Sequence, residues 1–209
     1  VSYTKNSGNT LTFGSNNGKI KSANKLGIKG IQGEHSREYD LKATNPKFIT
    51  GDKRYTNNCQ RCVCTYEARR RGYDVTAKPL LSDNDNIAKM DLKKGLPSVF
   101  KNADVMKISG FTGNSVKKNI EKRMSEWGNG SRAIVGVHWK NDGMGHVFIA
   151  EQIDGKTLFV DPQSNNLDVK KYFKCIKTSI KESDYTYIFR TDNLEFTDKI
   201  KKCFDEVRK

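Results

Sequence analysis

The spacing of apolar residues along the chain predicts two helices and a later group of strands. Residues 59–71 and 115–127 carry apolar side chains at helical intervals, and a glycine directly follows each segment. Alternation of apolar and polar residues, with turn residues between the runs, predicts the strands. They are expected at residues 73–77, 132–139, 146–153, 156–161 and 185–190, with a short helix at 169–175 and a final amphipathic helix at 194–207. This order of elements predicts an α+β fold.

The first quarter of the chain differs from the rest. Residues 1–50 are rich in Gly, Asn, Ser and Lys and have weak periodicity, so we expect a flexible or weakly ordered arm or linker. Residues 51–209 are expected to form one domain with its own core. Because the sequence begins at Val1 rather than at Met, we also expect a fragment or processed piece of a longer protein.

The chain is strongly basic, with a formal net charge of +14 and a pI of about 9.5. This balance suits an acidic protein partner, nucleic acid or an anionic surface. The cations are spread along the whole sequence, which is more typical of a solvated surface than of a binding groove. Nucleic acid is therefore the weaker expectation, and Arg69–Arg71 are expected to form a solvated helix end with one arginine in an ion pair. No stretch approaches the length of a transmembrane helix.

Cysteine usage points to reduced thiols. There are five cysteines, an odd number, and Cys59, Cys62 and Cys64 stand close together, which is no disulfide framework. The spacing of Cys59 and Cys62 is half of a zinc site, but no second paired motif exists. We therefore expect no metal and no cofactor, with Cys62 packed in the core.

Cys59 opens the first predicted helix, where a thiol is best placed to act as a nucleophile. The partial positive charge and the amides of a helix N-terminus favour a thiolate. The amides of Cys59 and Gln60 could hold an oxyanion formed on a carbonyl group, and Asn57 or Asn58 could cap the helix or add a side-chain donor.

A predicted hairpin supplies an imidazole and a carboxylate. With Asp154 and Gly155 as its two turn residues, Phe148 pairs with Asp161. His146 is then the diagonal neighbour of Asp161 on the same face, about 7–8 Å away between backbone positions. The two side chains can hydrogen-bond, and Asp161 would orient the imidazole of His146 beside the thiol of Cys59.

Two other residues near this group have less certain roles. Gln163 follows the acid and either lines the site or ends the strand. His138, within an apolar strand, is expected to be a structural histidine.

Three motifs stand out, Asn58-Cys59-x-x-Cys62-Val63-x-x-Tyr66-Glu67-x-Arg69-Arg70-Arg71-Gly72-Tyr73-Asp74-Val75-x-Ala77, Gly145-His146-Val147-Phe148 and Val160-Asp161-Pro162-Gln163. Together they resemble the papain-fold toxins, also called toxin glutamine deamidases. The resemblance covers about residues 51–163. In that family the cysteine after an asparagine is the nucleophile, which implies that Cys59, His146 and Asp161 form the catalytic triad. The implied fold is a papain-like one, in which the helix with the nucleophile packs on an antiparallel sheet.

The resemblance implies deamidation of a protein glutamine through a thioester. Such domains occur at the C-termini of bacterial polymorphic toxins, injected effectors and phage head-associated proteins. This implies a module delivered from a larger protein into the reducing cytoplasm of a target cell. The implied partners are a protein with a target glutamine and an acidic immunity protein. A papain-like protease or acyltransferase would share the first half-reaction, so the triad alone does not separate these enzymes. A non-catalytic basic module that binds nucleic acid or an acidic partner is the other alternative.

Overall fold

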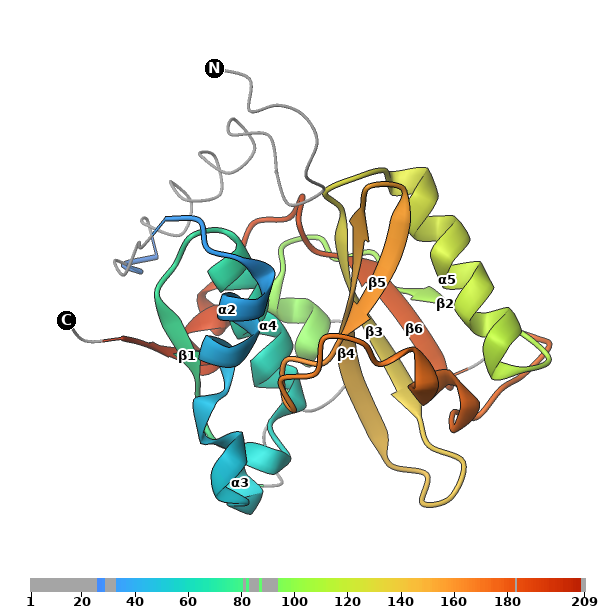
Figure 1. Ribbon diagram of the computed structural model, residues 1–209, viewed down its shortest axis with the longest axis horizontal. Coiled ribbons are helices and arrows are strands. Elements are labelled where there is room, and N and C mark those ends of the chain that lie inside the picture. Colours follow the sequence, from blue (N-terminus) through green and yellow to red (C-terminus); the bar gives the residue numbers. More distant parts are fainter. Residues whose placement is uncertain are drawn as a thin grey trace.

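The computed structural model describes residues 26–28, 33–80, 82, 87, 94–182 and 184–207. Figure 1 shows a helical part around α4 beside an antiparallel sheet, with α5 on the far side of that sheet. The α-helices are α2 (Arg37–Thr44), α3 (Lys53–Thr56), α4 (Cys59–Arg70) and α5 (Gly113–Trp127). Short 3₁₀ helices are η1 (Pro46–Thr50), η3 (Leu96–Val99), η4 (Lys170–Lys174) and η5 (Asp198–Lys202).

The main sheet has five strands in the order β2-β6-β3-β4-β5, and every neighbouring pair is antiparallel. A smaller sheet pairs β1 with β7 beside α4. The predicted α+β architecture, with the Cys59 helix packed on an antiparallel sheet, is therefore confirmed. The strands are β1 (Val75–Ala77), β2 (Met106–Lys107), β3 (Arg132–His138), β4 (Gly145–Ile153), β5 (Lys156–Val160), β6 (Thr186–Arg190) and β7 (Phe204–Glu206).

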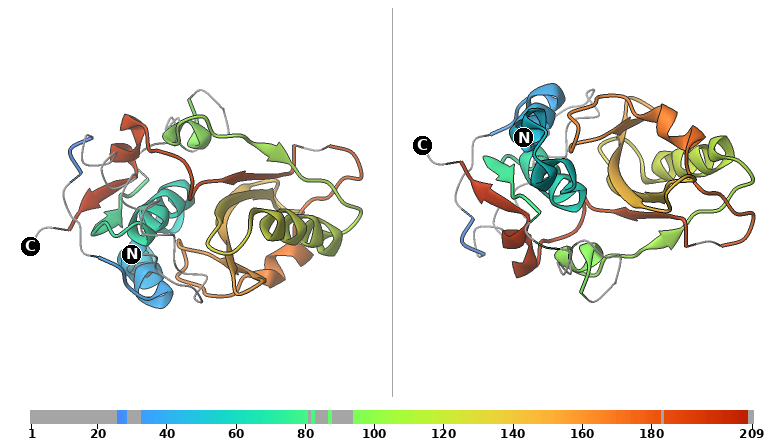
Figure 2. Two further views of the ribbon diagram at one scale, coloured as in Figure 1. Left: turned by 90° about the horizontal axis from the view of Figure 1, so that it is seen from above. Right: turned by 90° about the horizontal axis from the view of Figure 1, so that it is seen from below.

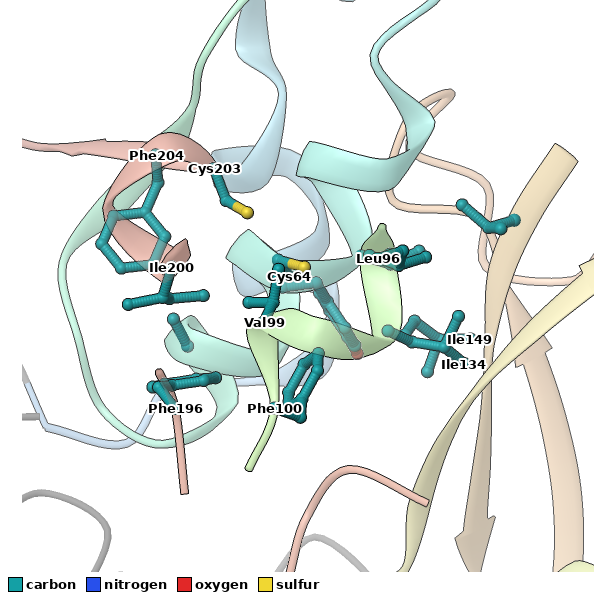
Figure 3. Close-up of a cluster of buried hydrophobic side chains, with 14 of the residues drawn as sticks. Cys64, Leu96, Val99, Phe100, Ile134, Ile149, Phe196, Ile200, Cys203 and Phe204 are labelled. Atoms are coloured by element: carbon teal, nitrogen blue, oxygen red, sulfur yellow. The ribbon is translucent and has the colours of Figure 1, made fainter. Parts of the chain in front are cut away.

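The sheet separates two hydrophobic clusters, because successive side chains of a strand point to opposite faces. Ile134 and Ile149 belong to the cluster on the α4 side, which Figure 3 shows at close range. Val135 and Phe148, one position along the same strands, belong to the cluster under α5. The views in Figure 2 show α4 and α5 on opposite sides of the curved sheet. Both faces are thus buried, so β3 reads as a nearly continuous apolar run.

The hairpin that carries the imidazole has the predicted register. Asp154 and Gly155 both have positive φ angles, 47° and 74°, as a tight two-residue turn requires. Ile153 pairs with Lys156, and the ladder runs to Ile149 opposite Val160. Asp161 comes directly after this ladder and begins a loop.

The chain before Gly51 belongs to the folded domain, contrary to the prediction for residues 33–50. Helix α2 packs against α4, and its Asp40 is fully buried. Asp40 pairs with Arg69 at 3.2 Å and with Arg70 at 2.8 Å. The polar composition of this segment misled the prediction because its charged groups are paired inside the protein. The prediction for residues 1–25 lies outside the described residues.

The three consecutive arginines are buried, so the prediction of a solvated helix end is wrong. Arg69, Arg70 and Arg71 are at most 8% exposed. Arg71 Nε lies 2.7 Å from Glu67 Oε1, one turn earlier on α4. Charged residues are rarely buried unless they are paired, and here the partners come from α2, α4 and the sheet.

The chain after Leu194 forms no long helix, which corrects the prediction for residues 194–207. It contains η5 and then β7, whose Phe204 pairs with Ala77 of β1. Ile200, Cys203 and Phe204 pack into the α4-side cluster, as Figure 3 shows. Backbone pairing with β1 and this packing stabilise the observed structure more than the helical spacing of the apolar residues would stabilise a helix.

The start of α5 depends on a glycine. Thr112 caps this helix, and the first helical residue is Gly113. A Cβ atom at Gly113 would overlap the backbone carbonyl of Phe173 in η4. The absence of a side chain therefore lets α5 and η4 approach each other this closely.

We expect Gly113→Ala to lower the free energy of unfolding by about 3 kcal/mol, because the overlap with Phe173 can be relieved only by moving backbone. Urea denaturation followed by circular dichroism would measure the loss. The control is Asn114→Ala at the next, exposed position. Equal stability of the two variants would contradict the close approach of α5 and η4.

No helix within the described ranges is long and apolar enough to cross a membrane.

Candidate active site

Cys59 is the first residue of α4, and its side chain is 6% exposed. Asn58 occupies the N-cap position, but within the described part of the chain its side chain makes no capping hydrogen bond. Instead, Asn58 Nδ2 donates to the carbonyl of Lys78 at 3.0 Å, and Asn58 Oδ1 accepts from Cys62 Sγ at 3.2 Å. The prediction of a side-chain cap is therefore wrong for Asn58. Its side-chain amide instead links the start of α4 to the backbone of Lys78 and to the thiol of Cys62.

The imidazole and the carboxylate meet as the hairpin register predicted. His146 Nε2 lies 3.1 Å from Asp161 Oδ2. The thiol of Cys59 is a second hydrogen-bond partner of the same imidazole. Because Nε2 is directed to Asp161, Nδ1 is the nitrogen left for the sulfur. The structure thus brings together the three residues that the sequence singled out.

The imidazole is surrounded by groups that favour its protonated form. Burial by itself lowers the pKa of His146. Hydrogen bonds to Asp161 and Cys59, together with their negative charges, outweigh burial and raise this pKa from 6.5 to about 10. A histidine that keeps its proton at neutral pH is the partner a cysteine thiolate requires.

Asp161 is held by four donors. Its Oδ2 atom accepts from His146, from Ser164 Oγ at 2.8 Å and from the hydroxyl of Tyr172 at 2.8 Å. Its Oδ1 atom accepts from the backbone N–H of Gln163 at 2.9 Å. Burial by itself raises the pKa of Asp161, but the hydrogen bond and charge of His146 outweigh it and lower the pKa. Asp161 is therefore fixed as an ionised acceptor.

Aromatic side chains enclose the histidine. Trp139 stacks on His146, with ring centroids 5.7 Å apart and an interplanar angle of 24°. Phe148, two residues further along the same strand, has its ring centroid 6.4 Å from that of the imidazole, and the ring of Tyr172 meets the imidazole edge-on at 5.8 Å. These rings limit the access of water to the pair formed by His146 and Asp161, which strengthens their electrostatic interaction.

A cleft of about 890 Å³ opens over the thiol and the imidazole. Asn57, Gln60 and Gln163 line it, whereas Asn58 and Asp161 are buried and are not among its lining residues. The full lining is Thr56, Asn57, Cys59, Gln60, Leu80, Gly136, Val137, His138, Trp139, Met144, Gly145, His146, Val147, Gln163 and Tyr187.

His138, which was expected to be a structural histidine, contacts a backbone carbonyl at the edge of the cleft. It lines the cleft, and its Nδ1 atom lies 3.4 Å from the carbonyl oxygen of Tyr185. His138 is half-buried at the end of β3, where it forms part of the cleft wall.

Ser164 and Tyr172 are partners of the acid that were not predicted from the sequence. Ser164 stands only three residues after the acid, so its nearness in the sequence was the available signal. Tyr172 comes from η4, and only the tertiary fold reveals its contact.

The other cysteines take no part in the cleft lining. Cys62, Cys64 and Cys203 are buried, and burial raises the pKa of the thiols of Cys62 and Cys64 well above the ordinary value. Within the described ranges, no cluster of three or more His, Cys, Asp or Glu side chains could hold a metal ion.

These positions supply the parts for acyl chemistry through sulfur. A thiol at a helix N-terminus can attack a carbonyl carbon, and the imidazole can take and return a proton. The first amides of a helix have no partner inside the helix, so they suit a developing oxyanion.

A family model described as papain fold toxin 1, glutamine deamidase, matches residues 57–166, more than half of the chain. Among solved structures, a variant of the Salmonella effector SpvD is similar at 14% sequence identity, with a TM-score of 0.46. That match covers 84% of this chain and 91% of the effector. No curated protein matches.

Proposed function

Because this chain belongs to the papain fold toxin 1, glutamine deamidase family, we propose that it hydrolyses the side-chain amide of a glutamine in a protein substrate. Membership makes it a papain-like enzyme domain of the toxin and effector type. The observation that carries the proposed chemistry is the hydrogen-bonded series from Cys59 through His146 to Asp161.

In the proposed first half-reaction, the thiolate of Cys59 attacks the amide carbon of the glutamine. The backbone amides of Cys59 and Gln60 hold the oxyanion. Protonated His146 then gives its proton to the amide nitrogen, the carbon–nitrogen bond breaks, and ammonia leaves behind a thioester. Asp161 keeps the imidazole oriented during this transfer.

In the proposed second half-reaction, a water molecule attacks the thioester. His146 takes a proton from the water, the carbon–sulfur bond breaks, and the product is a glutamate side chain with Cys59 restored. Asn57 and Gln163, which line the cleft, are proposed to contact the substrate.

The proposed place of action is the cytoplasm of a target cell, after delivery as part of a larger protein. All five cysteines are free, which suits a reducing compartment. The net charge of +14 favours an acidic protein as the neutralising partner.

Comparison of proteomes would test the proposal. Cells expressing the chain are compared with cells expressing Cys59→Ala, and peptides are searched for glutamine-to-glutamate conversion. Conversion that appears only with the unsubstituted chain supports deamidation. New peptide termini would instead indicate a protease, and a proteome identical in both cultures would contradict the proposed activity.

A further inference from the structure

Asn45 makes a three-way contact directly behind the candidate active site. This residue lies between α2 and η1 and is fully buried. Its Nδ2 atom donates to the carbonyl oxygens of Tyr55 and Gln163, each at 2.9 Å. The same atom lies 3.4 Å from Asn58 Oδ1. One amide group thus joins segments that are 118 positions apart in the sequence.

Two of these three acceptors, in Asn58 and Gln163, belong to residues within two positions of the candidate triad. Asn58 immediately precedes Cys59 at the start of α4. Gln163 donates its backbone N–H to Asp161, so the carbonyl that Asn45 holds belongs to the residue that fixes the acid. Asn45 therefore connects the support of the nucleophile with the support of the carboxylate.

The chemistry of the contact requires a donor at this position. Three oxygen atoms converge on the Nδ2 atom, and exchanging the two ends of the amide would place a fourth oxygen among them. The other end, Asn45 Oδ1, is buried and has no hydrogen-bond partner among the described residues. A buried acceptor without a partner is costly, so the favourable part of this arrangement is the set of hydrogen bonds that Nδ2 donates.

We propose that Asn45 is a positioning residue, which fixes the loop of Asp161 relative to the start of the helix that carries Cys59. Its role in turnover rests on the proposed function. Its role in placing the three side chains rests on the geometry alone. Asn45 lies outside residues 57–166, the segment that the family model matches.

The test separates positioning from general support of the fold. Asn45→Ala removes the donor without adding charge, and Asn45→Ser keeps a single donor in a shorter side chain. The matched control is Asn119→Ala on α5, which removes one amide hydrogen bond, to the carbonyl of Ser109 at 2.8 Å, at an exposed position. Melting temperature and circular dichroism report on folding for all variants.

The first readout is NMR titration of His146, one of three histidines in the chain, assigned with the aid of His146→Gln. In Asn45→Ala the loop of Asp161 loses its tie to the helix start, so His146 should titrate at a clearly lower pH than in the unsubstituted protein. Alkylation of Cys59 by iodoacetamide should slow as well. Asn45→Ser should fall between, and Asn119→Ala should match the unsubstituted protein.

The second readout is turnover of the protein substrate, where kcat should fall about 10- to 100-fold in Asn45→Ala with little change in KM. A lower melting temperature with unchanged titration of His146 and unchanged alkylation would overturn the positioning role. If Asn45→Ala does not fold, Asn45→Ser decides between the same outcomes. Absence of turnover in the unsubstituted protein would contradict the proposed function, while titration and alkylation would still test Asn45.

Discussion

Replacement of Cys59 by alanine is expected to lower the rate of glutamine deamidation by about 10⁴-fold or more, since loss of the nucleophile removes the covalent route. The substitution deletes one sulfur atom from a nearly buried side chain, so the cost in unfolding free energy should be about 1 kcal/mol. Ammonia release and thermal melting would measure the two effects on the same samples.

The matched control for this substitution is Cys175→Ala. Cys175 is the exposed cysteine of the five, and it does not line the cleft. It should leave both the rate and the stability unchanged. Deamidation by Cys59→Ala at a rate close to that of the unsubstituted chain would remove the thiol from the mechanism.

Replacement of Glu67 by alanine is expected to lower the free energy of unfolding by about 3–5 kcal/mol, because it leaves buried arginines without their carboxylate. Glu67 is fully buried on α4. It accepts from Arg71 Nε at 2.7 Å, and from Arg132 Nε and Nη2 at 2.8 and 2.9 Å. Arg132 begins β3, so this carboxylate ties the helix of the nucleophile to the sheet. Chemical denaturation would measure the loss.

The same carboxylate predicts a stability that depends on pH. Burial by itself raises the pKa of Glu67, but the charges and hydrogen bonds of Arg132 and Arg71 outweigh it and lower the pKa from 4.5 to about 2. A carboxyl group whose pKa is lower in the folded state stabilises the protein above the unfolded value. Its contribution should therefore be complete above about pH 4.5 and decline as the pH falls towards 2.

A matched control for Glu67 is Glu126→Ala. Glu126 pairs with Arg123 at 2.8 Å on the exposed side of α5. An exposed pair of this kind contributes only about 0–1 kcal/mol. If Glu67→Ala and Glu126→Ala cost the same, or if Glu67→Gln keeps the full acid sensitivity of the unsubstituted chain, the buried carboxylate does not have the role described.

Local signals in the sequence predicted the centre of the site. The turn at Asp154 and Gly155 fixes the register of the hairpin, and the register brings His146 to Asp161. The apolar spacing and glycine stop predict the helix that Cys59 begins. Both rest on contacts between neighbouring parts of the chain, where periodicity and turn chemistry are informative.

The remaining features depend on partners that are remote in the sequence. Arg69–Arg71 read as a solvated run because nothing near them shows that Asp40 and Glu151 will be buried beside them. Asn45 stands in a polar segment, and its contact with Gln163 exists only after folding. The strand at 204–206 is too short for its alternation to outweigh the helical spacing around it.

The pairing of β1 with β7 has a consequence for the order of events during biosynthesis. The ribosome completes the helix of Cys59 long before it adds residues 204–206, which supply the second strand of the small sheet beside that helix. Until then, the nascent chain has an open strand edge and an unfilled place for Phe204. The small sheet beside the helix of Cys59 is therefore completed only after residues 204–206 have been synthesised.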